Sequence, residues 1–130
     1  MNLQDPRRET IRISSVAANQ GQEVCAMCAP NNSVRIVRVR YIPDSQIITS
    51  AAAGFVLALV NAGTAGAGAT TVASDTFNTA ATYPAKVPIS LTLSSSVDVS
   101  EGEVLIWKES TVGTGTARAN GAVVIEYIHL

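Results

Sequence analysis

The sequence has little of the chemistry that most enzymes use. Its 130 residues include one histidine, two cysteines and only 5% aromatic residues. The histidine, His129, is next to the last residue, where no third group is placed to orient it as a base, so we expect an exposed tail residue. The glycine-rich stretch 63–68 lacks the Gly-Lys-Ser/Thr of a phosphate-binding loop and should simply connect strands. We therefore expect no catalytic residues, no cofactor and no enzyme.

Metal ligands are also scarce. Cys25 and Cys28 form a C-x-x-C pair, but a zinc site needs a second pair of ligands. Residues three apart on a strand point to opposite faces, so we expect two small buried hydrophobic side chains. The acids Asp98, Glu101 and Glu103 surround Gly102 without the spacing of a calcium loop, and this is ordinary turn composition. The sequence predicts no metal site.

Charge and the length of the apolar runs argue against two further classes of partner, nucleic acids and membranes. The net charge is −1, but residues 1–40 carry six arginines against three acids, and residues 41–130 carry three basic residues against seven acids. A basic excess this small, with few aromatics, does not predict nucleic-acid binding. The most apolar run, 51–59, is much shorter than the roughly 20 residues that span a bilayer. The polar opening residues suggest no export signal, so we expect no membrane partner, synthesis in a cytoplasm and reduced cysteines.

What the sequence has in abundance is β-branched residues. Valine and isoleucine together number 25 against seven leucines, and serine and threonine add 24. Branching at Cβ disfavours helix and suits a pleated sheet. The best long strand is 33–42, where Val37, Val39 and Tyr41 alternate with Arg38 and Arg40. Because Val34 and Ile36 fall on the arginine side, that face is either mixed or shifted by a bulge.

Short strands separated by turn residues continue along the chain. We expect a strand covered on both faces at 55–60, an edge strand starting near Pro88, a strand with a core Trp107, and a last strand with Val123, Ile125 and Tyr127 on one face. Another strand is expected at 22–28, while 46–53 is ambiguous. About eight strands predict a single-domain, all-β antiparallel β-sandwich or jelly roll. Residues 1–20 form an extended N-terminal arm or edge strand, and 21–130 form the sandwich.

The arginines are the candidate site. Two of them share a strand face, and guanidinium groups on such a face can pair with carboxylates of a partner, although a solvated outer face would look the same. The candidate partner-binding residues are Arg7, Arg8, Arg12, Arg35, Arg38 and Arg40.

Several stretches together resemble the jelly-roll capsid decoration (cement) proteins of tailed bacteriophages. The resemblance covers about 30–128, with residues 1–29 outside it, and it is carried by 34–43, 55–63, 97–105, 111–115 and 121–127. It implies a virion protein, made in the bacterial host cytoplasm, that binds the outer surface of the head as a homodimer or homotrimer. Its partner would be the major capsid protein, whose neighbouring subunits it would clamp. The family has no catalytic residues to transfer.

Other functions remain open on the sequence alone. The main alternative is a receptor- or carbohydrate-binding head of a phage fibre or tail, which would need exposed aromatic side chains. Only Tyr41, Tyr83, Tyr127 and Trp107 are available, and Trp107 lies in an apolar strand. A β-sandwich enzyme would need a catalytic cluster that these residues do not form, and a non-viral adhesive module is a further alternative.

Overall fold

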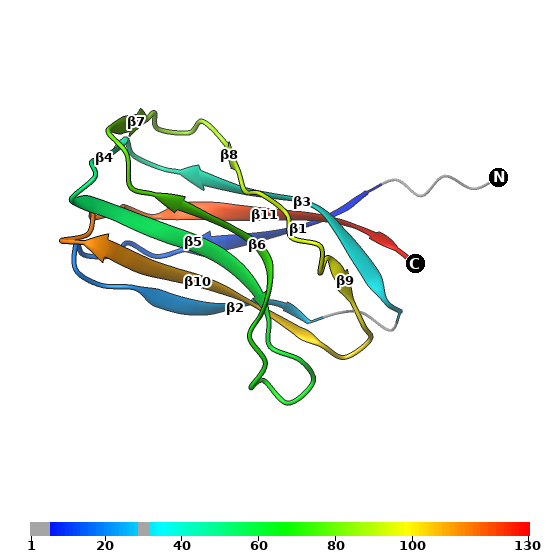
Figure 1. Ribbon diagram of the computed structural model, residues 1–130. Coiled ribbons are helices and arrows are strands. Elements are labelled where there is room, and N and C mark those ends of the chain that lie inside the picture. Colours follow the sequence, from blue (N-terminus) through cyan, green and yellow to red (C-terminus); the bar gives the residue numbers. More distant parts are fainter. Residues whose placement is uncertain (1–5, 29–31) are drawn as a thin grey trace.

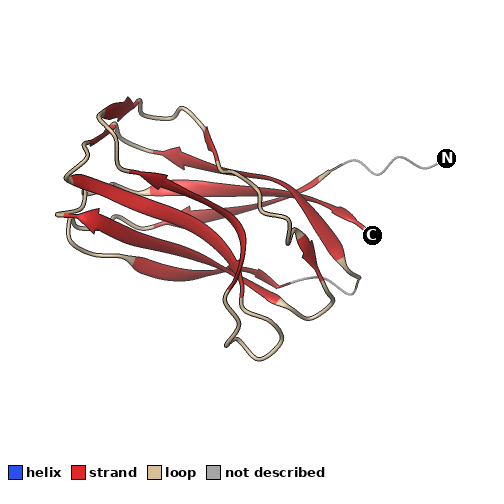
Figure 2. Ribbon diagram, in the orientation of Figure 1, coloured by secondary structure: helices blue, strands red, loops and turns tan. Residues whose placement is uncertain are grey.

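The computed structural model describes residues 6–28 and 32–130, and all of their regular structure is β-strand (Figures 1 and 2). Among them, no helix is long and apolar enough to cross a bilayer. The strands are β1 Arg7–Ile13, β2 Gln22–Cys28, β3 Val34–Pro43, β4 Ile47–Thr49, β5 Ala53–Asn61, β6 Thr70–Phe77, β7 Ala81–Tyr83, β8 Ile89–Ser90, β9 Asp98–Val99, β10 Val104–Gly113 and β11 Gly121–His129.

Two antiparallel sheets face each other. One has the order β1-β11-β3-β8, with β9 also paired to β3, and the other has the order β2-β10-β5-β6. If β8 and β9 are taken as one interrupted strand and the small β4-β7 ribbon is set aside, eight strands remain. The first, eighth, third and sixth then form one sheet, and the second, seventh, fourth and fifth form the other. This is the order of a jelly roll and confirms the predicted fold class.

The segment after Pro88 joins the two sheets along one side. Ile89 and Ser90 pair with β3, and the Leu91 amide donates to the Val39 carbonyl at 2.9 Å. The chain then crosses to β6, where the Ser74 and Ser94 amides donate to the Thr92 and Val72 carbonyls at 3.1 and 2.8 Å. The predicted edge strand is therefore only two residues long, because its hydrogen bonds are divided between two sheets.

The N-terminal residues belong to the sandwich. β1 pairs with β11 over seven residues, from Arg7 opposite Tyr127 to Ile13 opposite Gly121. Beyond it, Val16 and Arg118 exchange backbone hydrogen bonds of 2.7 and 2.9 Å. Gly115 makes this approach possible, because its φ is 74° and a side chain there would collide with the Ala18 carbonyl. Residues 1–5 of the expected arm lie outside the described residues.

A bulge decides which side chains of β3 enter the core. The register with β11 passes from Arg38 opposite Glu126 to Ile36 opposite Tyr127, which leaves Val37 as the extra residue. Val34, Ile36, Val39 and Tyr41 are all buried, and Val37 is only half-buried. The bulge was one of the two alternatives that the sequence allowed, and Val37, expected on the same face as Val39 and Tyr41, is the extra residue of that bulge.

Aromatic rings join the sheets across the interior. Tyr41 of β3 stacks on Trp107 of β10 with centroids 6.1 Å apart, and both side chains are almost fully buried. Phe55 stacks on Phe77 at 4.8 Å, and Phe77 meets the Tyr83 ring edge-on at 5.4 Å. Each buried ring stabilises the fold by about 1.5–3 kcal/mol relative to exposure. The prediction that Trp107 lies in the core is confirmed.

β5 differs from the expectation in one respect. Phe55, Leu57 and Leu59 are fully buried between the sheets, but Val56 and Ala58 on the other face are only half-buried. The apolar strand was predicted to be covered on both faces, and within the described chain its outer face is partly open. The ambiguous segment 46–53 contains the short strand β4, which pairs with β7 in a separate ribbon.

Candidate interaction surface

Arginine side chains gather on the outer face of the β1-β11-β3 sheet. The register aligns Arg8, Glu126 and Arg38 in one row across the three strands, and Thr10, Val124 and Arg40 in the next. Side chains opposite one another in antiparallel strands point to the same face, so strands distant in sequence bring three arginines around one carboxylate.

Glu126 is the centre of this group. Its Oε1 accepts a hydrogen bond from Arg40 Nη2 at 2.7 Å, and Arg8 Nε lies 3.4 Å from the same oxygen. Arg38 Nε lies 3.9 Å from Oε2. The Glu126 side chain is 10% exposed, whereas those of Arg8 and Arg38 are 68% and 55% exposed. Arg40 is therefore bound by the Glu126 carboxylate. The guanidinium groups of Arg8 and Arg38 face solvent and interact with this carboxylate only weakly.

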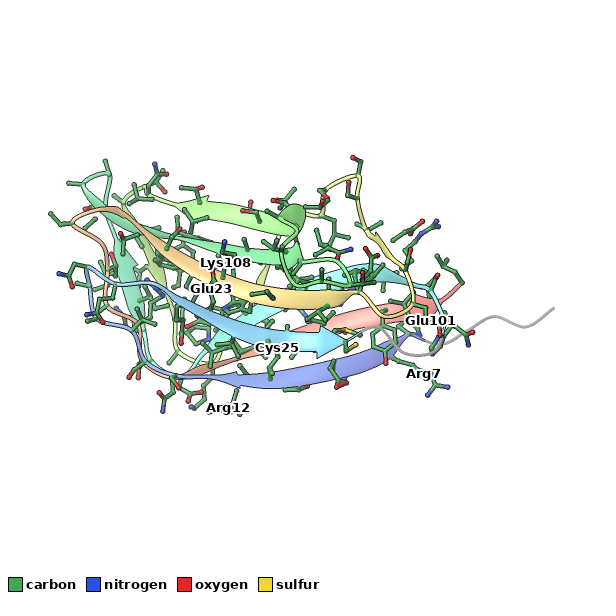
Figure 3. The ribbon with its side chains drawn as sticks, turned by 90° about the horizontal axis from the view of Figure 1, so that it is seen from below. Arg7, Arg12, Glu23, Cys25, Glu101 and Lys108 are labelled. Atoms are coloured by element: carbon green, nitrogen blue, oxygen red, sulfur yellow. The ribbon has the colours of Figure 1, made fainter. Side chains whose placement is uncertain are left out.

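The remaining candidate arginines lie outside this cluster. Arg12 donates to Asp44 at 2.8 Å, and Arg35 donates twice to Asp98, at 2.7 and 3.1 Å. The hydrogen bonds from Arg35 hold the pKa of the Asp98 carboxyl below its usual range. Arg7 lies at the opposite end of β1 from Arg12 (Figure 3). The structure thus brings together Arg8, Arg38 and Arg40 of the six predicted residues.

The residue that organises the cluster, Glu126, was missed from the sequence. It lies in the last strand next to the predicted core positions, and nothing local links it to Arg40, which comes 86 residues earlier, or to the still more distant Arg8. A signal does exist in the alternation of that strand: with Ile125 and Tyr127 facing inward, Glu126 must face outward beside β3. Pairing of β3 with β11 could not be read from the sequence, so the contact could not be either.

A second polar cluster, buried inside the sandwich, was also missed. Arg118 Nε donates to Glu109 Oε1 at 2.8 Å, and both side chains are essentially inaccessible to solvent. Trp107 and Gln22 donate to the other oxygen of Glu109, each at 2.9 Å. The Arg118 guanidinium also lies 4.6 Å from the centre of the Phe55 ring. This network orders the core, and among the described residues its buried Arg118 Nη2 has no hydrogen-bond partner.

The cysteines are not where the sequence placed them. Both are exposed and free, so the expectation of two buried hydrophobic side chains was wrong. The register of β2 with β10 passes from Cys25 opposite Ile106 to Met27 opposite Leu105, which leaves Ala26 as a bulge. This extra residue shifts the alternation, so Cys28 returns to the outer face with Cys25 instead of lying opposite it. Figure 3 shows Cys25 on β2.

The other sequence candidates do not converge. Asp98 is paired with Arg35, and Glu103 accepts a hydrogen bond from the Ser100 amide at 2.6 Å. The part of the chain that the structure describes holds no group of three or more potential metal ligands. His129 is not an exposed tail residue. It belongs to β11, where it pairs with Val34 of β3, and its ring packs edge-on against the ring of Tyr127. The glycine-rich stretch forms the connection between β5 and β6, as predicted.

Comparisons with known proteins do not establish a family for this chain. No family model matches the sequence, and no curated protein does. Solved structures that align include infectious bursal disease virus, Gx strain, at a TM-score of 0.35 and 15% identity, covering 99% of this chain and 35% of that one. T=1 particles derived from infectious bursal virus align at a TM-score of 0.37 and 15% identity, covering 99% and 33%. The chain thus spans about a third of those chains, and TM-scores this low do not establish a shared fold.

Proposed function

We propose that this chain is a decoration, or cement, protein of a tailed-bacteriophage head. In this proposal it is not an enzyme, and it binds the outer surface of the assembled capsid through the face that carries Arg8, Arg38 and Arg40. Its partner is the major capsid protein, it is made in the cytoplasm of the bacterial host, and it ends up on the virion. The observation that carries the proposal is the group of three arginines around the single carboxylate of Glu126.

The cluster has more positive charge than it neutralises. Three guanidinium groups share one carboxylate, so a surplus of two positive charges remains on a flat sheet face. Arg8 and Arg38 are the exposed members, and their distances to Glu126 of 3.4 and 3.9 Å leave most of their N–H groups free. A guanidinium group binds a carboxylate with two parallel hydrogen bonds, which gives orientation as well as affinity. This surface therefore fits an acidic protein surface.

A protein that binds only the assembled lattice stabilises that lattice by mass action. Repeated copies on a capsid also strengthen weak single contacts through effective concentration. The jelly-roll fold supports the proposal by analogy alone, because that fold is used by both viral capsid and lectin domains.

The lectin-like alternative needs an aromatic platform for a sugar. Trp107 and Tyr41 are buried in the core, and Tyr83 and Tyr127 are each half-buried against a neighbouring ring. None of the tyrosines or the tryptophan offers a freely exposed ring. The arginine face is thus the better-supported site.

Co-sedimentation with phage heads that lack the protein tests the proposal. The full chain should pellet with heads at a saturable stoichiometry, and the double variant Arg8→Ala/Arg38→Ala should bind at least about 10-fold more weakly. Arg35→Ala is the matched control: Arg35 is exposed too, but two of its N–H groups are bound by Asp98, so its loss should leave binding unchanged. Circular dichroism establishes that each variant is folded.

The contrary results are equally clear. Wild-type protein that ignores heads but binds glycans would replace this proposal with the receptor-binding alternative. Binding to heads that survives in the double variant would show that another surface makes the contact.

A further inference from the structure

The C-x-x-C pair is a motif that neither the core nor the arginine face uses. Cys25 and Cys28 are free and exposed, while Ala26 and Met27 between them are buried. Two buried residues in a row between two exposed ones are what the bulge at Ala26 produces, because the extra residue reverses the alternation beyond it. Both thiols therefore leave β2 on its outer face.

The partner strand gives the spacing of the two thiols. Cys25 lies opposite Ile106 of β10 and Cys28 lies opposite Val104, so the cysteines occupy positions that are two residues apart in the ladder. The Cα atoms of such positions are about 6.6–6.8 Å apart along a strand, and disulfides usually join Cα atoms about 4.4–6.8 Å apart. Cys28 is the last residue of β2, so a small shift that closes the pair disturbs only the end of the ladder.

Small reagents can reach both thiols. β2 is the end strand of the order β2-β10-β5-β6, so its outer face is open along one side (Figure 3). On the other side the pair is flanked by Ile106 and Val104, whose apolar side chains are half-buried. Thiol–disulfide exchange requires access to the attacking sulfur, and this part of the surface provides it for Cys25 and for Cys28.

We propose that Cys25 and Cys28 form a reversible dithiol site, which a low-molecular-weight disulfide oxidises to a disulfide within the chain. The thiolate of one cysteine attacks the small disulfide, which releases one small thiol and leaves a mixed disulfide on the protein. The other thiolate then attacks the protein sulfur of the mixed disulfide and releases the second small thiol. The chain loses two electrons and two protons, and the reagent gains them as two thiols.

The state of this site depends on the surroundings of the chain. Reducing compartments keep thiols reduced, oxidising ones favour disulfides, and exposed disulfides are readily reduced again. The site does not depend on the proposed capsid binding, because β2 belongs to one sheet and the arginine face to the other. Thiol chemistry on the isolated chain therefore tests the site, and co-sedimentation tests the capsid contact.

Oxidised glutathione tests the site on the full chain. The reduced wild type, incubated with an excess of this reagent, should lose both of its thiols and retain no glutathione, and dithiothreitol should restore the thiols. Mass spectrometry should show a chain lighter by two hydrogen atoms, with a bridge between Cys25 and Cys28 in its proteolytic peptides. Cys25→Ser and Cys28→Ser should each retain one glutathione as a mixed disulfide. Circular dichroism verifies that the chain is folded during the reaction.

The matched control moves one thiol along the same face. In Cys28→Ser/Ser110→Cys the second thiol lies at an exposed position of β10, four residues beyond Ile106 and therefore about 13 Å along the strand from Cys25. This variant should retain two glutathiones and form no bridge. A folded wild type that retains glutathione, keeps its thiols or forms a disulfide between two chains overturns the proposal. So does an internal bridge in the control variant, because it would show that the thiols meet only when the chain unfolds.

Discussion

The two outer faces of the sandwich are built from the same kind of strand but differ in chemistry. On β1-β11-β3 the outward positions of the flanking strands carry arginines, and Ala122, Val124 and Glu126 of the central strand are buried between them. On β2-β10-β5-β6 the outward positions of the two central strands are mainly apolar, and a single ion pair lies to one side. Long arginine side chains cover one sheet from within the chain, whereas the described residues provide no such cover on the other sheet.

The two faces are suited to two different modes of binding. An arginine-bearing face binds through charge and hydrogen bonds that salt weakens, while an apolar face binds through burial that salt leaves intact. Both faces depend on the core that lies between them.

The largest effect on stability is expected from breaking the buried ion pair between Arg118 and Glu109, which lies between the sheets. Arg118→Ala leaves the Glu109 carboxylate buried without a counter-charge and should lower the free energy of unfolding by about 3–5 kcal/mol. Capsid binding should then fail at temperatures where the wild type is folded. Denaturant unfolding measures the loss.

The double variant Arg118→Met/Glu109→Gln is the control for that result. It removes both charges, so it should be more stable than Arg118→Ala alone. A loss below about 1 kcal/mol in the single variant would show that the pair is not important for the core.

Local patterns in the sequence predicted most strands and the jelly roll itself. β11 follows from alternating apolar residues, and the core position of Trp107 follows from its apolar strand. The misplaced residues all depend on strand pairing. Val37 was expected to share a face with Val39, and Cys28 to lie opposite Cys25. A bulge changes both, and it is defined by the partner strand, which was known neither for β3 nor for β2.

The candidate site was predicted only in part for a related reason. A charged side chain that alternates with apolar ones in a strand indicates the solvent-facing side, which is why Arg38 and Arg40 were predicted. Arg118 lies in a loop rich in glycine and threonine, where no periodicity shows that it turns inward to Glu109. Which arginines share a carboxylate depends on sheet order, and this information is non-local.

A smaller effect is expected from Tyr41, which ties the arginine-bearing sheet to Trp107 of the other. Burial, reinforced by the negative charge of Glu109, raises the pKa of Tyr41 from 10.0 to about 12. The folded chain therefore keeps this proton to higher pH than the unfolded chain does. Its contribution is fully present below pH 10 and should be lost as pH rises to 12, by about 2–3 kcal/mol.

Comparison with Tyr41→Phe isolates this contribution, because lysines and the other tyrosines titrate in the same range. The free energy of unfolding, measured by denaturant at each pH, should fall more steeply between pH 10 and 12 in the wild type than in the variant. Parallel curves would mean that folding does not raise the pKa of Tyr41.

The smallest change in stability, and the sharpest contrast between the faces, is expected from Glu126→Gln. The amide oxygen can still accept from Arg40, but the charge is lost, so the free energy of unfolding should fall by about 1 kcal/mol. Because the three arginines then lack their counter-charge, capsid binding should strengthen severalfold and depend more steeply on salt. Asp98→Asn is the matched control, since it frees Arg35 outside the cluster and should leave capsid affinity unchanged. Weaker capsid binding by Glu126→Gln would mean that the carboxylate contributes to recognition itself, and the partner surface would then be basic at that point instead of acidic.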